Sequence, residues 1–486
     1  MRKLNETIHH KEYRPIKVLQ FGEGNFLRAF VEWIIQEMNN KGVFDGDVVV
    51  VQPMPFGRIK NLEEQNGLYT LYLEGLQNGE VIQRHQVIDV LGDYLDPFTQ
   101  YQEYLEYAKS SELQFIISNT TEAGIALDPT DLDLTTTPKS FPGKLLAFLK
   151  TRYDYFNGDM SKGLFIIPCE LIDYNGRELK RVLGELARLQ GLSLDFIRWM
   201  ENANKFYNTL VDRIVPGYPR NQITEIEKEL GYSDDNIVKG EIFHLWVIEG
   251  DKSLQEVFDP RKAGLNVVFT DNIKPYKERK VKILNGSHTA MVPVSYLYGI
   301  DTVRETIEDE LLGKYVRTFV YKEVVPTIKL PESEMKFFAD SVLERYGNPF
   351  VRHELMSIAL NSTTKYVTRI LPTVLDFYRE FGKIPAIAAF SFAALCVFYK
   401  GDRNGTPIAL QDNPEYLEMW KHLWNGYDTS IDSIENIVDS LLAHEEIWGL
   451  NLNTLGNFKE LVVKGISSIL NKGMKASVEE VLAHYE

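Results

Sequence analysis

The chain has 486 residues, of which 44% are hydrophobic and 25% are charged, and its formal net charge at pH 7 is −16. This length exceeds one average core, so we expect two domains, or one large α/β unit with a cap. The negative charge argues against a nucleic-acid-binding surface, and an anionic substrate would need a local basic pocket.

Cysteine and histidine usage gives no sign of a disulfide framework or a metal site. Cys169 and Cys396 are the only cysteines, and the nine histidines show no metal-ligand spacing. Residues 1–14 are polar, unlike a signal peptide. The longest apolar run, residues 384–399, falls short of the ~20 residues of a membrane span and predicts a buried core helix. We therefore expect a cytoplasmic protein with no metal and no membrane partner.

The first predicted elements are a short buried strand at residues 16–21, a glycine turn, and an amphipathic helix at residues 31–38. This order is the context of a dinucleotide-binding fingerprint. Gly22 permits the tight turn, and Gly24 lets the backbone approach a pyrophosphate. Leu27 occupies the position of the usual third glycine, so the pattern alone is a weak signal. The candidate cofactor-binding residues of this turn are Phe21, Gly22, Gly24, Asn25, Phe26 and Arg28.

The end of the second predicted strand, residues 47–52, leaves the choice of cofactor open. A ribose-binding acid normally stands at this place, but the sequence has Gln52, which we include among the cofactor-binding candidates. Arg58 could meet the 2′-phosphate of NADP, or it could be a solvated loop residue. The residues by themselves therefore do not decide between NAD and NADP.

Further short apolar runs alternate with turns up to residue 270. A hairpin is predicted from residues 69–74 and 81–91 around a turn at 77–79. Other strands are predicted at 113–119, 163–168, 241–249 and 267–270, the last two as late strands of the same sheet, and a helix at 178–191. The strand at 113–119 leads to Thr121 and Glu122, which we expect near the nicotinamide because strand ends in a doubly wound sheet face the ligand crevice.

Long amphipathic helical patterns dominate after residue 270. The predicted fold class is therefore α/β, with a Rossmann-like doubly wound sheet domain at residues 1–270 and a mostly α-helical domain at 271–486.

The stretch 275–288 contains the candidate catalytic residues Lys280, Asn285 and His288, which share one side of a regular helix. Lysine can act as a general acid or base, asparagine can donate to a developing oxyanion, and histidine can hold the same oxygen. A solvated basic helix with one satisfied histidine is the alternative interpretation.

A second pair of cations, Lys365 and Arg369, is predicted one helical turn apart in residues 357–369. Two cations on one stripe with little acid nearby suit a carboxylate. A solvated helix face is the alternative.

The spacing of Lys280, Asn285 and His288 resembles the catalytic signature of the polyol-specific long-chain dehydrogenases, the mannitol dehydrogenase family. Residues 121–124 resemble its Thr-Glu-x-Gly element, and residues 211–216 its Val-Asp-Arg-Ile-x-Pro signature. The resemblance implies an NAD-dependent enzyme without a metal, in which Lys280 is the acid/base and Asn285 and His288 position the reacting oxygen. It also implies that Asp212 belongs to the substrate site. Asp212 and Arg213 would ordinarily form a structural ion pair.

Residues 19–30, 168–173 and 357–362 are most similar to the branch of this family that reduces tagaturonate, a linear hexuronate, to the aldonate altronate with NADH. Reduction of fructuronate and oxidation of a neutral polyol are the alternatives within the family, and a nucleotide-binding sensor without turnover is an alternative outside it. The chain departs from mannitol-type members at Leu171, where they carry a second oxyanion asparagine, and at Lys277, where they carry a proton-outlet glutamate.

Overall fold

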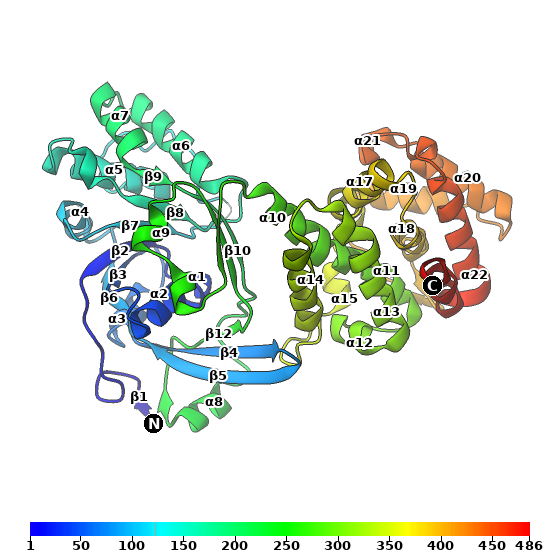
Figure 1. Ribbon diagram of the computed structural model, residues 1–486, viewed down its shortest axis with the longest axis horizontal. Helices are drawn as coiled ribbons and strands as arrows, with labels where there is room; N and C mark the ends of the chain where they lie inside the picture. Colours follow the sequence, from blue (N-terminus) through cyan, green and yellow to red (C-terminus); the bar gives the residue numbers. More distant parts are fainter. Residues whose placement is uncertain (122) are drawn as a thin grey trace. The chain divides into compact units, whose positions relative to one another are not determined.

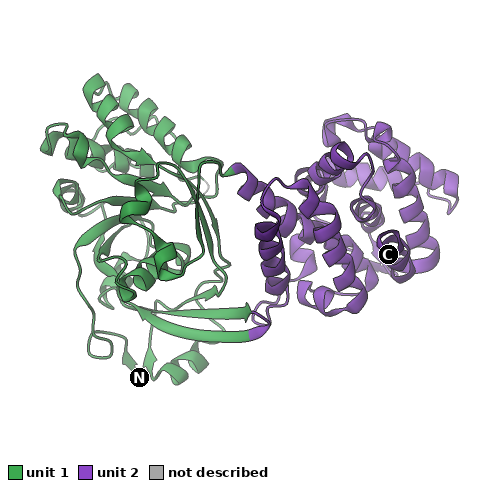
Figure 2. Ribbon diagram, viewed as in Figure 1, with its two compact units in different colours: residues 1–77, 81–273 green, residues 78–80, 274–486 purple. Residues whose placement is uncertain are grey.

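The structure is a computed structural model that describes residues 1–121 and 123–486. The chain divides into two compact units, shown in different colours in Figure 2. Unit 1 contains residues 1–77 and 81–273, and unit 2 contains residues 78–80 and 274–486.

Unit 1 is built on a six-stranded sheet in the order β6-β3-β2-β7-β8-β9, in which every neighbouring pair is parallel (Figure 1). The strands are β2 (Ile16–Phe21), β3 (Asp47–Val51), β6 (Leu91–Leu95), β7 (Phe115–Ser118), β8 (Phe165–Pro168) and β9 (Lys205–Phe206). Numbered along the chain, this order is 3-2-1-4-5-6, that of a doubly wound dinucleotide-binding sheet. The order reverses between β2 and β7, so the ligand crevice is expected at the carboxyl ends of these two strands.

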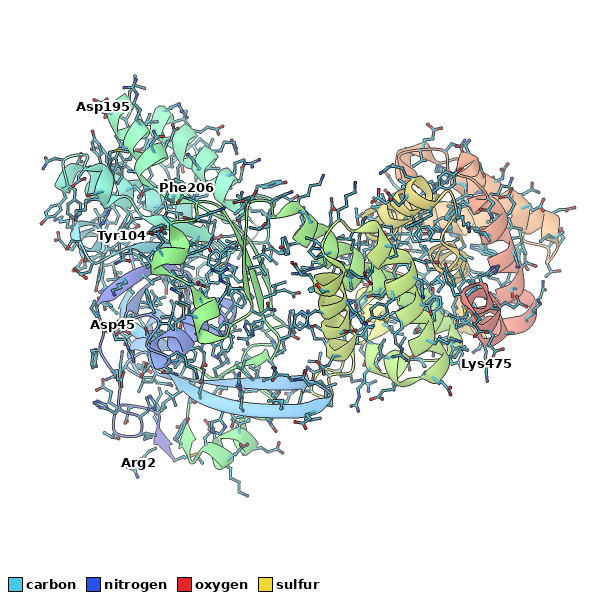
Figure 3. The ribbon with its side chains drawn as sticks, viewed as in Figure 1. Arg2, Asp45, Tyr104, Asp195, Phe206 and Lys475 are labelled. Carbon is cyan, nitrogen blue, oxygen red and sulfur yellow. The ribbon has the colours of Figure 1, made fainter. Side chains whose placement is uncertain are left out.

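Alternating side chains of the sheet enter two separate cores. Val18, Val48 and Val50 belong to one core and Leu19 to the other, as expected for strands that are buried on both faces. One face is covered by α1 (Asn25–Ala29) and α2 (Val31–Asn40), and the other by α4 (Tyr101–Glu106), α5 (Phe141–Tyr155), α6 (Asn175–Leu189) and α7 (Leu194–Ala203). Tyr104 of α4, labelled in Figure 3, is fully buried in this second core.

Two smaller sheets accompany the main one. The predicted hairpin is confirmed as β4 (Tyr69–Gln77) and β5 (Glu80–Ile88), which are joined by β12 (Val238–Glu241) in a sheet of their own. Strands β10 (Asn208–Asp212), β13 (Leu245–Glu249) and β14 (Val267–Thr270) form another sheet. The prediction that residues 241–249 and 267–270 extend the main sheet is therefore wrong. Strand β13 instead pairs antiparallel with β10, and a short apolar run carries no information about the sheet that it joins.

The remaining elements of unit 1 are short. They are β1 (Arg2–Lys3), which pairs with β11 (Tyr232–Ser233), and the helices α3 (Ile59–Glu63), α8 (Ile223–Leu230) and α9 (Leu254–Val257).

Unit 2 is almost entirely helical. Its helices are α10 (Lys274–Arg279), the π-helix η4 (Lys280–Asn285), α11 (Gly286–Tyr298), α12 (Val303–Glu308), α13 (Glu310–Thr318), the π-helix η5 (Phe319–Val324), α14 (Glu332–Tyr346), α15 (Leu355–Ile358), α16 (Ser362–Arg369), α17 (Leu371–Phe381), α18 (Ala386–Phe398), α19 (Pro414–Trp424), α20 (Ile431–Leu442), α21 (Glu445–Trp448) and α22 (Phe458–Leu482). A short hairpin of two-residue strands, β15 (Asp402–Arg403) and β16 (Thr406–Pro407), follows α18. The Rossmann-like sheet followed by a helical region confirms the predicted fold class.

The apolar run at residues 384–399 forms α18, whose side chains from Ile387 to Phe398 are buried. This helix packs against α11 and α22, so it is the core helix that the sequence predicts. Across the described residues, no helix combines the length and the apolar composition that a membrane crossing requires.

Candidate active site

The glycine turn after β2 has the geometry that a dinucleotide needs. Gly22 has φ +111°, and a Cβ there would lie 2.8 Å from the carbonyl oxygen of Asn119. Both the backbone conformation and this close contact therefore exclude a side chain at position 22. Gly24 is the N-cap of α1, no side chain of the described residues caps this helix end, and the space beside Gly24 is open. A pyrophosphate could therefore reach the backbone N–H groups, and these residues fit the cofactor.

Phe21 and Arg28 support this turn from beneath. Both side chains are fully buried, so the contact with a cofactor that the sequence predicts for these residues would come through their backbone atoms. The guanidinium of Arg28 donates to the carbonyl oxygen of Asn236 and to Asn25 Oδ1, at 2.7 Å for the latter, and lies over the ring of Tyr69. Burial lowers the pKa of Arg28. Asn25 is thus fixed by Arg28, while Phe26 stacks on Phe30 with ring centroids 5.0 Å apart.

The ends of β7 and β8 are joined through Glu170, which the sequence analysis did not select. Its buried carboxylate accepts hydrogen bonds from Ser118 Oγ at 3.0 Å and from the backbone N–H and Oγ1 of Thr120 at 3.0 and 2.9 Å. Burial raises the pKa of Glu170, and these hydrogen bonds oppose the rise. Thr121, which follows Thr120, is exposed and has φ +91°. This value is an outlier for a β-branched residue, and backbone strain of this kind is concentrated at ligand sites. Glu122 lies outside the described residues.

Asp212 is the last residue of β10 and is buried, with 5% of its surface exposed. The neighbouring Arg213 lies over the ring of Trp33. Its guanidinium donates to three backbone carbonyl oxygens, those of Ala29, Ile242 and Phe243. Arg213 thereby ties the end of β10 to α1 and to the segment before β13.

The predicted catalytic residues begin in a π-helix, not in a regular α-helix. Residues Lys280 to Asn285 form η4, between α10 and α11. A π-helix is bonded from i to i+5, so Lys280 and Asn285 lie about one turn apart and face a common side more closely than in the regular helix that the sequence predicts. His288 follows three residues later on α11. Short π-helical segments are frequent at functional sites.

His288 lies at the centre of a group of side chains that we call the His288 cluster. Its ring packs against Tyr346, with centroids 4.4 Å apart, and edge-on against His353, with centroids 5.1 Å apart. Its Nε2 atom is buried and has no hydrogen-bond partner among the residues that the structure describes. The pKa of His288 is lowered well below its usual value, first by burial and then by the positive charges of Arg345, Arg369 and Lys365 and by His353. The imidazole is therefore neutral.

Lys365 and Arg369 lie on α16, and their charges act on His288. A Cβ on Gly286 would come within 3.1 Å of the Arg369 carbonyl oxygen, so α16 packs closely against the start of α11. Lys365 Nζ donates to the carbonyl oxygen of Ile358 at 2.7 Å. Burial lowers the pKa of both cations, and the charge of Arg369 lowers that of Lys365 further. The predicted carboxylate-binding pair and the predicted catalytic histidine therefore belong to one cluster.

Three members of this cluster were missed by sequence reasoning: Arg345, Tyr346 and His353. Tyr346 contacts the π-helix η4 from the end of α14, through an OH that donates to the Leu284 carbonyl oxygen at 2.7 Å. These residues lie some distance along the chain from His288.

The two departures from the mannitol-type pattern lie in different units. Leu171, in the loop after β8, is 60% exposed and has no polar side-chain atom with which to replace an oxyanion donor. Lys277 is half-buried on α10.

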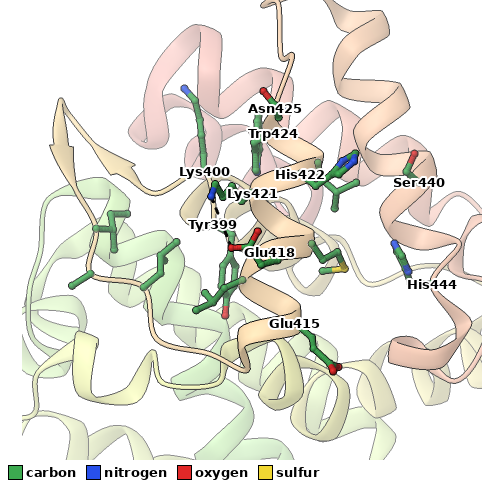
Figure 4. Close-up of a pocket in the computed structure, with 16 residues that line it drawn as sticks. Tyr399, Lys400, Glu415, Glu418, Lys421, His422, Trp424, Asn425, Ser440 and His444 are labelled. Carbon is green, nitrogen blue, oxygen red and sulfur yellow. Dashed lines mark ion pairs between the residues drawn. The ribbon is translucent and has the colours of Figure 1, made fainter.

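A surface hollow of about 1400 Å³ lies beside α19 and is bordered by Trp424 and His444 (Figure 4). A Lys421–Glu418 ion pair of 3.9 Å lies on its lining. None of the described residues predicted for the site borders it. Within the described parts of the chain, there is also no group of three or more His, Cys, Asp or Glu residues that could hold a metal ion.

Comparison with known protein families matches both parts of the chain. Residues 16–259 match the mannitol dehydrogenase Rossmann domain, and residues 272–470 match the mannitol dehydrogenase C-terminal domain. A protein of Phocaeicola vulgatus named altronate oxidoreductase is 45% identical over 484 residues, covering 99% of this chain and all of the relative. A Bacillus subtilis protein of the same name is 42% identical over 482 residues, covering 99% of this chain and 98% of the relative.

Solved structures show the same fold. A D-sorbitol dehydrogenase in substrate-free form has a TM-score of 0.82 at 22% identity, covering 98% of this chain and 100% of the other. The Pseudomonas fluorescens mannitol 2-dehydrogenase, in a complex with NAD and D-mannitol, has a TM-score of 0.66 at 24% identity, covering 99% of this chain and 96% of the other. The predicted resemblance is thus confirmed: the chain belongs to the mannitol dehydrogenase family, a family of NAD-dependent oxidoreductases that act on CH–OH groups.

Proposed function

We propose that this protein catalyses the reversible reduction of tagaturonate to altronate with NADH, without a metal ion. The observation that carries the proposal is the cluster around His288, where the imidazole is neutral, its buried Nε2 has no hydrogen-bond partner among the described residues, and positive side chains of α14 and α16 act on it. A carbonyl oxygen and a carboxylate on one small substrate match these two features. The names of the relatives in Phocaeicola and Bacillus support the same substrate pair.

The carboxylate end of the substrate would bind Lys365 and Arg369. Burial has already weakened the hydration of both cations, and they repel one another. An anion between them relieves that repulsion, and arginine can bind a carboxylate through two parallel hydrogen bonds. A chain with a net charge of −16 needs such a local cationic site to hold a hexuronate. A neutral ketose has no carboxylate that could bind this cationic site.

The keto oxygen would be held by His288 and Asn285 and protonated by Lys280. A neutral imidazole can present a ring N–H to that oxygen, and the amide of Asn285 can donate to it as negative charge develops. NADH, when bound, supplies the hydride that the carbonyl carbon receives. The Lys280 ammonium gives a proton to the resulting alkoxide and becomes an amine, which solvent reprotonates. In the reverse direction the amine accepts the proton of the altronate hydroxyl.

The first test is direct. Purified protein should oxidise NADH when tagaturonate is added, with one altronate formed for each NADH consumed, and treatment with EDTA should leave the rate unchanged because lysine, asparagine and histidine together polarise the carbonyl. No turnover with tagaturonate would refute the proposed substrate. Loss of activity with EDTA that returns on adding a divalent ion would refute the metal-independent chemistry.

A further inference from the structure

We propose that Glu23, the residue between the two glycines of the turn, is the acid that makes this protein select NAD over NADP, by binding the adenosine ribose. A doubly wound domain normally supplies this acid from the end of its second strand. Here that strand is β3, and Gln52 follows it. The structure indicates that the acid comes instead from the neighbouring loop.

The carboxylate of Glu23 lies beside the amide of Gln52. A Cβ built on Gly57 would come within 2.1 Å of Glu23 Oε1 and 2.4 Å of Gln52 Oε1, so both oxygens border the same small space. The Gln52 side chain is buried and is held by a 2.9 Å hydrogen bond from Nε2 to the Met54 carbonyl oxygen. Glu23 Oε1 in turn accepts the backbone N–H of Arg58 at 3.2 Å. Two acceptor oxygens are thereby fixed at the carboxyl end of β3.

This pair suits ribose hydroxyls and opposes a phosphate. Burial raises the pKa of Glu23, and the backbone N–H groups of Glu23 and Arg58 oppose the rise. An ionised carboxylate has about four lone-pair sites, so these two N–H groups leave room for hydroxyl donors. The 2′-phosphate of NADP offers almost no donor and brings up to about two negative charges next to Glu23. Arg58, whose positive charge acts on Glu23, cannot serve a phosphate without competition from that carboxylate. The position of Glu23 thus resolves the cofactor choice that Gln52 and Arg58 leave open in the sequence.

Two further features of the loop fit an adenosine site. Any residue larger than glycine at position 57 would displace the two oxygens, so the loop closes on them only because Gly57 has no side chain. Met54 and Phe56 are 48% and 74% exposed, and both stand in the same loop directly after β3. Apolar side chains next to a ribose site can cover the flat face of an adenine.

The test measures cofactor binding without any sugar acid, so its outcome does not depend on the proposed substrate. NADH and NADPH are titrated separately against the wild-type protein and Glu23→Gln, with nicotinamide fluorescence as the readout. Glutamine keeps an acceptor for the Arg58 N–H and removes the charge. The ratio of the NADPH Kd to the NADH Kd should fall by about 10- to 150-fold, the worth of a charge-assisted contact. Glu63→Gln, the same charge change at an exposed position of α3, should leave the ratio unaltered.

Three outcomes would overturn the assignment. An unchanged ratio in Glu23→Gln, even with both cofactors bound more weakly, would make Glu23 a structural residue of the turn. If Glu23→Gln does not fold, Glu23→Asp keeps the charge and should retain the preference for NADH, whereas Gly57→Ala should weaken NADH binding by pushing the oxygens apart. A preference lost in Glu23→Asp, or tight NADH binding in Gly57→Ala, would contradict the proposed arrangement.

Discussion

The imidazole of His288 packs against the phenol ring of Tyr346, with ring centroids 4.4 Å apart and ring planes 36° from parallel. The hydroxyl of the same tyrosine lies 2.7 Å from Ser287 Oγ and donates to the Leu284 carbonyl oxygen within the π-helix. One side chain therefore holds both the orientation of the histidine and the wide helical turn that brings Lys280 and Asn285 to a common side.

Tyr346→Phe tests this double role because it keeps the ring and removes the hydroxyl. The Leu284 carbonyl and the Ser287 hydroxyl lose a partner, which should lower the free energy of unfolding by roughly 1–2 kcal/mol. A 1 Å displacement of a catalytic group can cost ~10²-fold in rate. Because the ring of residue 346 remains against His288, we expect a smaller displacement and a fall in turnover of about tenfold. Denaturant unfolding and kcat are measured together. Reduced stability with an unaltered kcat would confine Tyr346 to a structural role.

Lys280→Ala should reduce turnover by ~10²–10⁴-fold, the usual contribution of general acid–base catalysis, while NADH still binds. Lys274→Ala provides the matched control, because Lys274 is an exposed lysine on the preceding helix, α10. Steady-state rates and NADH titrations are compared for the two variants. Near-normal turnover of Lys280→Ala at neutral pH would remove lysine from the acid/base role.

Arg369→Ala and Lys365→Ala should weaken the use of a hexuronate by about 10- to 150-fold, the value of a charge-assisted contact of roughly 1.5–3 kcal/mol. The slow reaction of a neutral ketose should change little, since such a substrate has no carboxylate. Arg304→Ala, which removes a partly exposed arginine of α12, controls for the change in charge. Equal losses on charged and neutral substrates would require the carboxylate site to be sought elsewhere.

Glu323 predicts a pH dependence of stability. It is fully buried in η5, where it accepts the N–H groups of Ile387 and Ala388 at 2.6 and 2.8 Å and the hydroxyl of Tyr485. Burial raises its pKa to about 7. Between the ordinary glutamate pKa and about 7, the unfolded chain therefore binds fewer protons than the folded one, so stability falls as pH rises through this range.

The size of the Glu323 contribution should be roughly 3 kcal/mol at ~1.4 kcal/mol per pKa unit. The measurement is the free energy of unfolding of wild type and Glu323→Gln at several pH values from about 4 to 8. Subtracting the two curves removes the other titrating groups. The free energy of unfolding of the wild type, relative to that of Glu323→Gln, should decrease as pH rises and then become constant above about pH 7. Parallel curves would mean that Glu323 does not titrate differently in the folded state.

The parts of the protein that could be predicted from sequence are those whose cause is local. The turn at Gly22 and the alternation of strands with helices follow from backbone freedom and apolar runs, and both led to the Rossmann-like sheet. The π-helix at Lys280 was not predicted, because the partner that bonds its Leu284 carbonyl, Tyr346, lies on another helix. Glu23 escaped notice for the same reason, since its proximity to Gln52 depends on the fold of the loop around Gly57.

The most direct test of the account is a comparison of kcat/KM for NADH-dependent reduction of tagaturonate, fructuronate, fructose and xylulose by the wild-type protein. We predict that tagaturonate exceeds fructuronate, because the relatives in Phocaeicola and Bacillus are altronate oxidoreductases by name. Both hexuronates should exceed the neutral ketoses by at least the 10- to 150-fold that a charge-assisted contact to Arg369 and Lys365 supplies. A neutral ketose reduced as well as either hexuronate would contradict the carboxylate-binding cluster around His288. The absence of turnover with all four, while NADH still binds, would identify a nucleotide-binding protein without this activity.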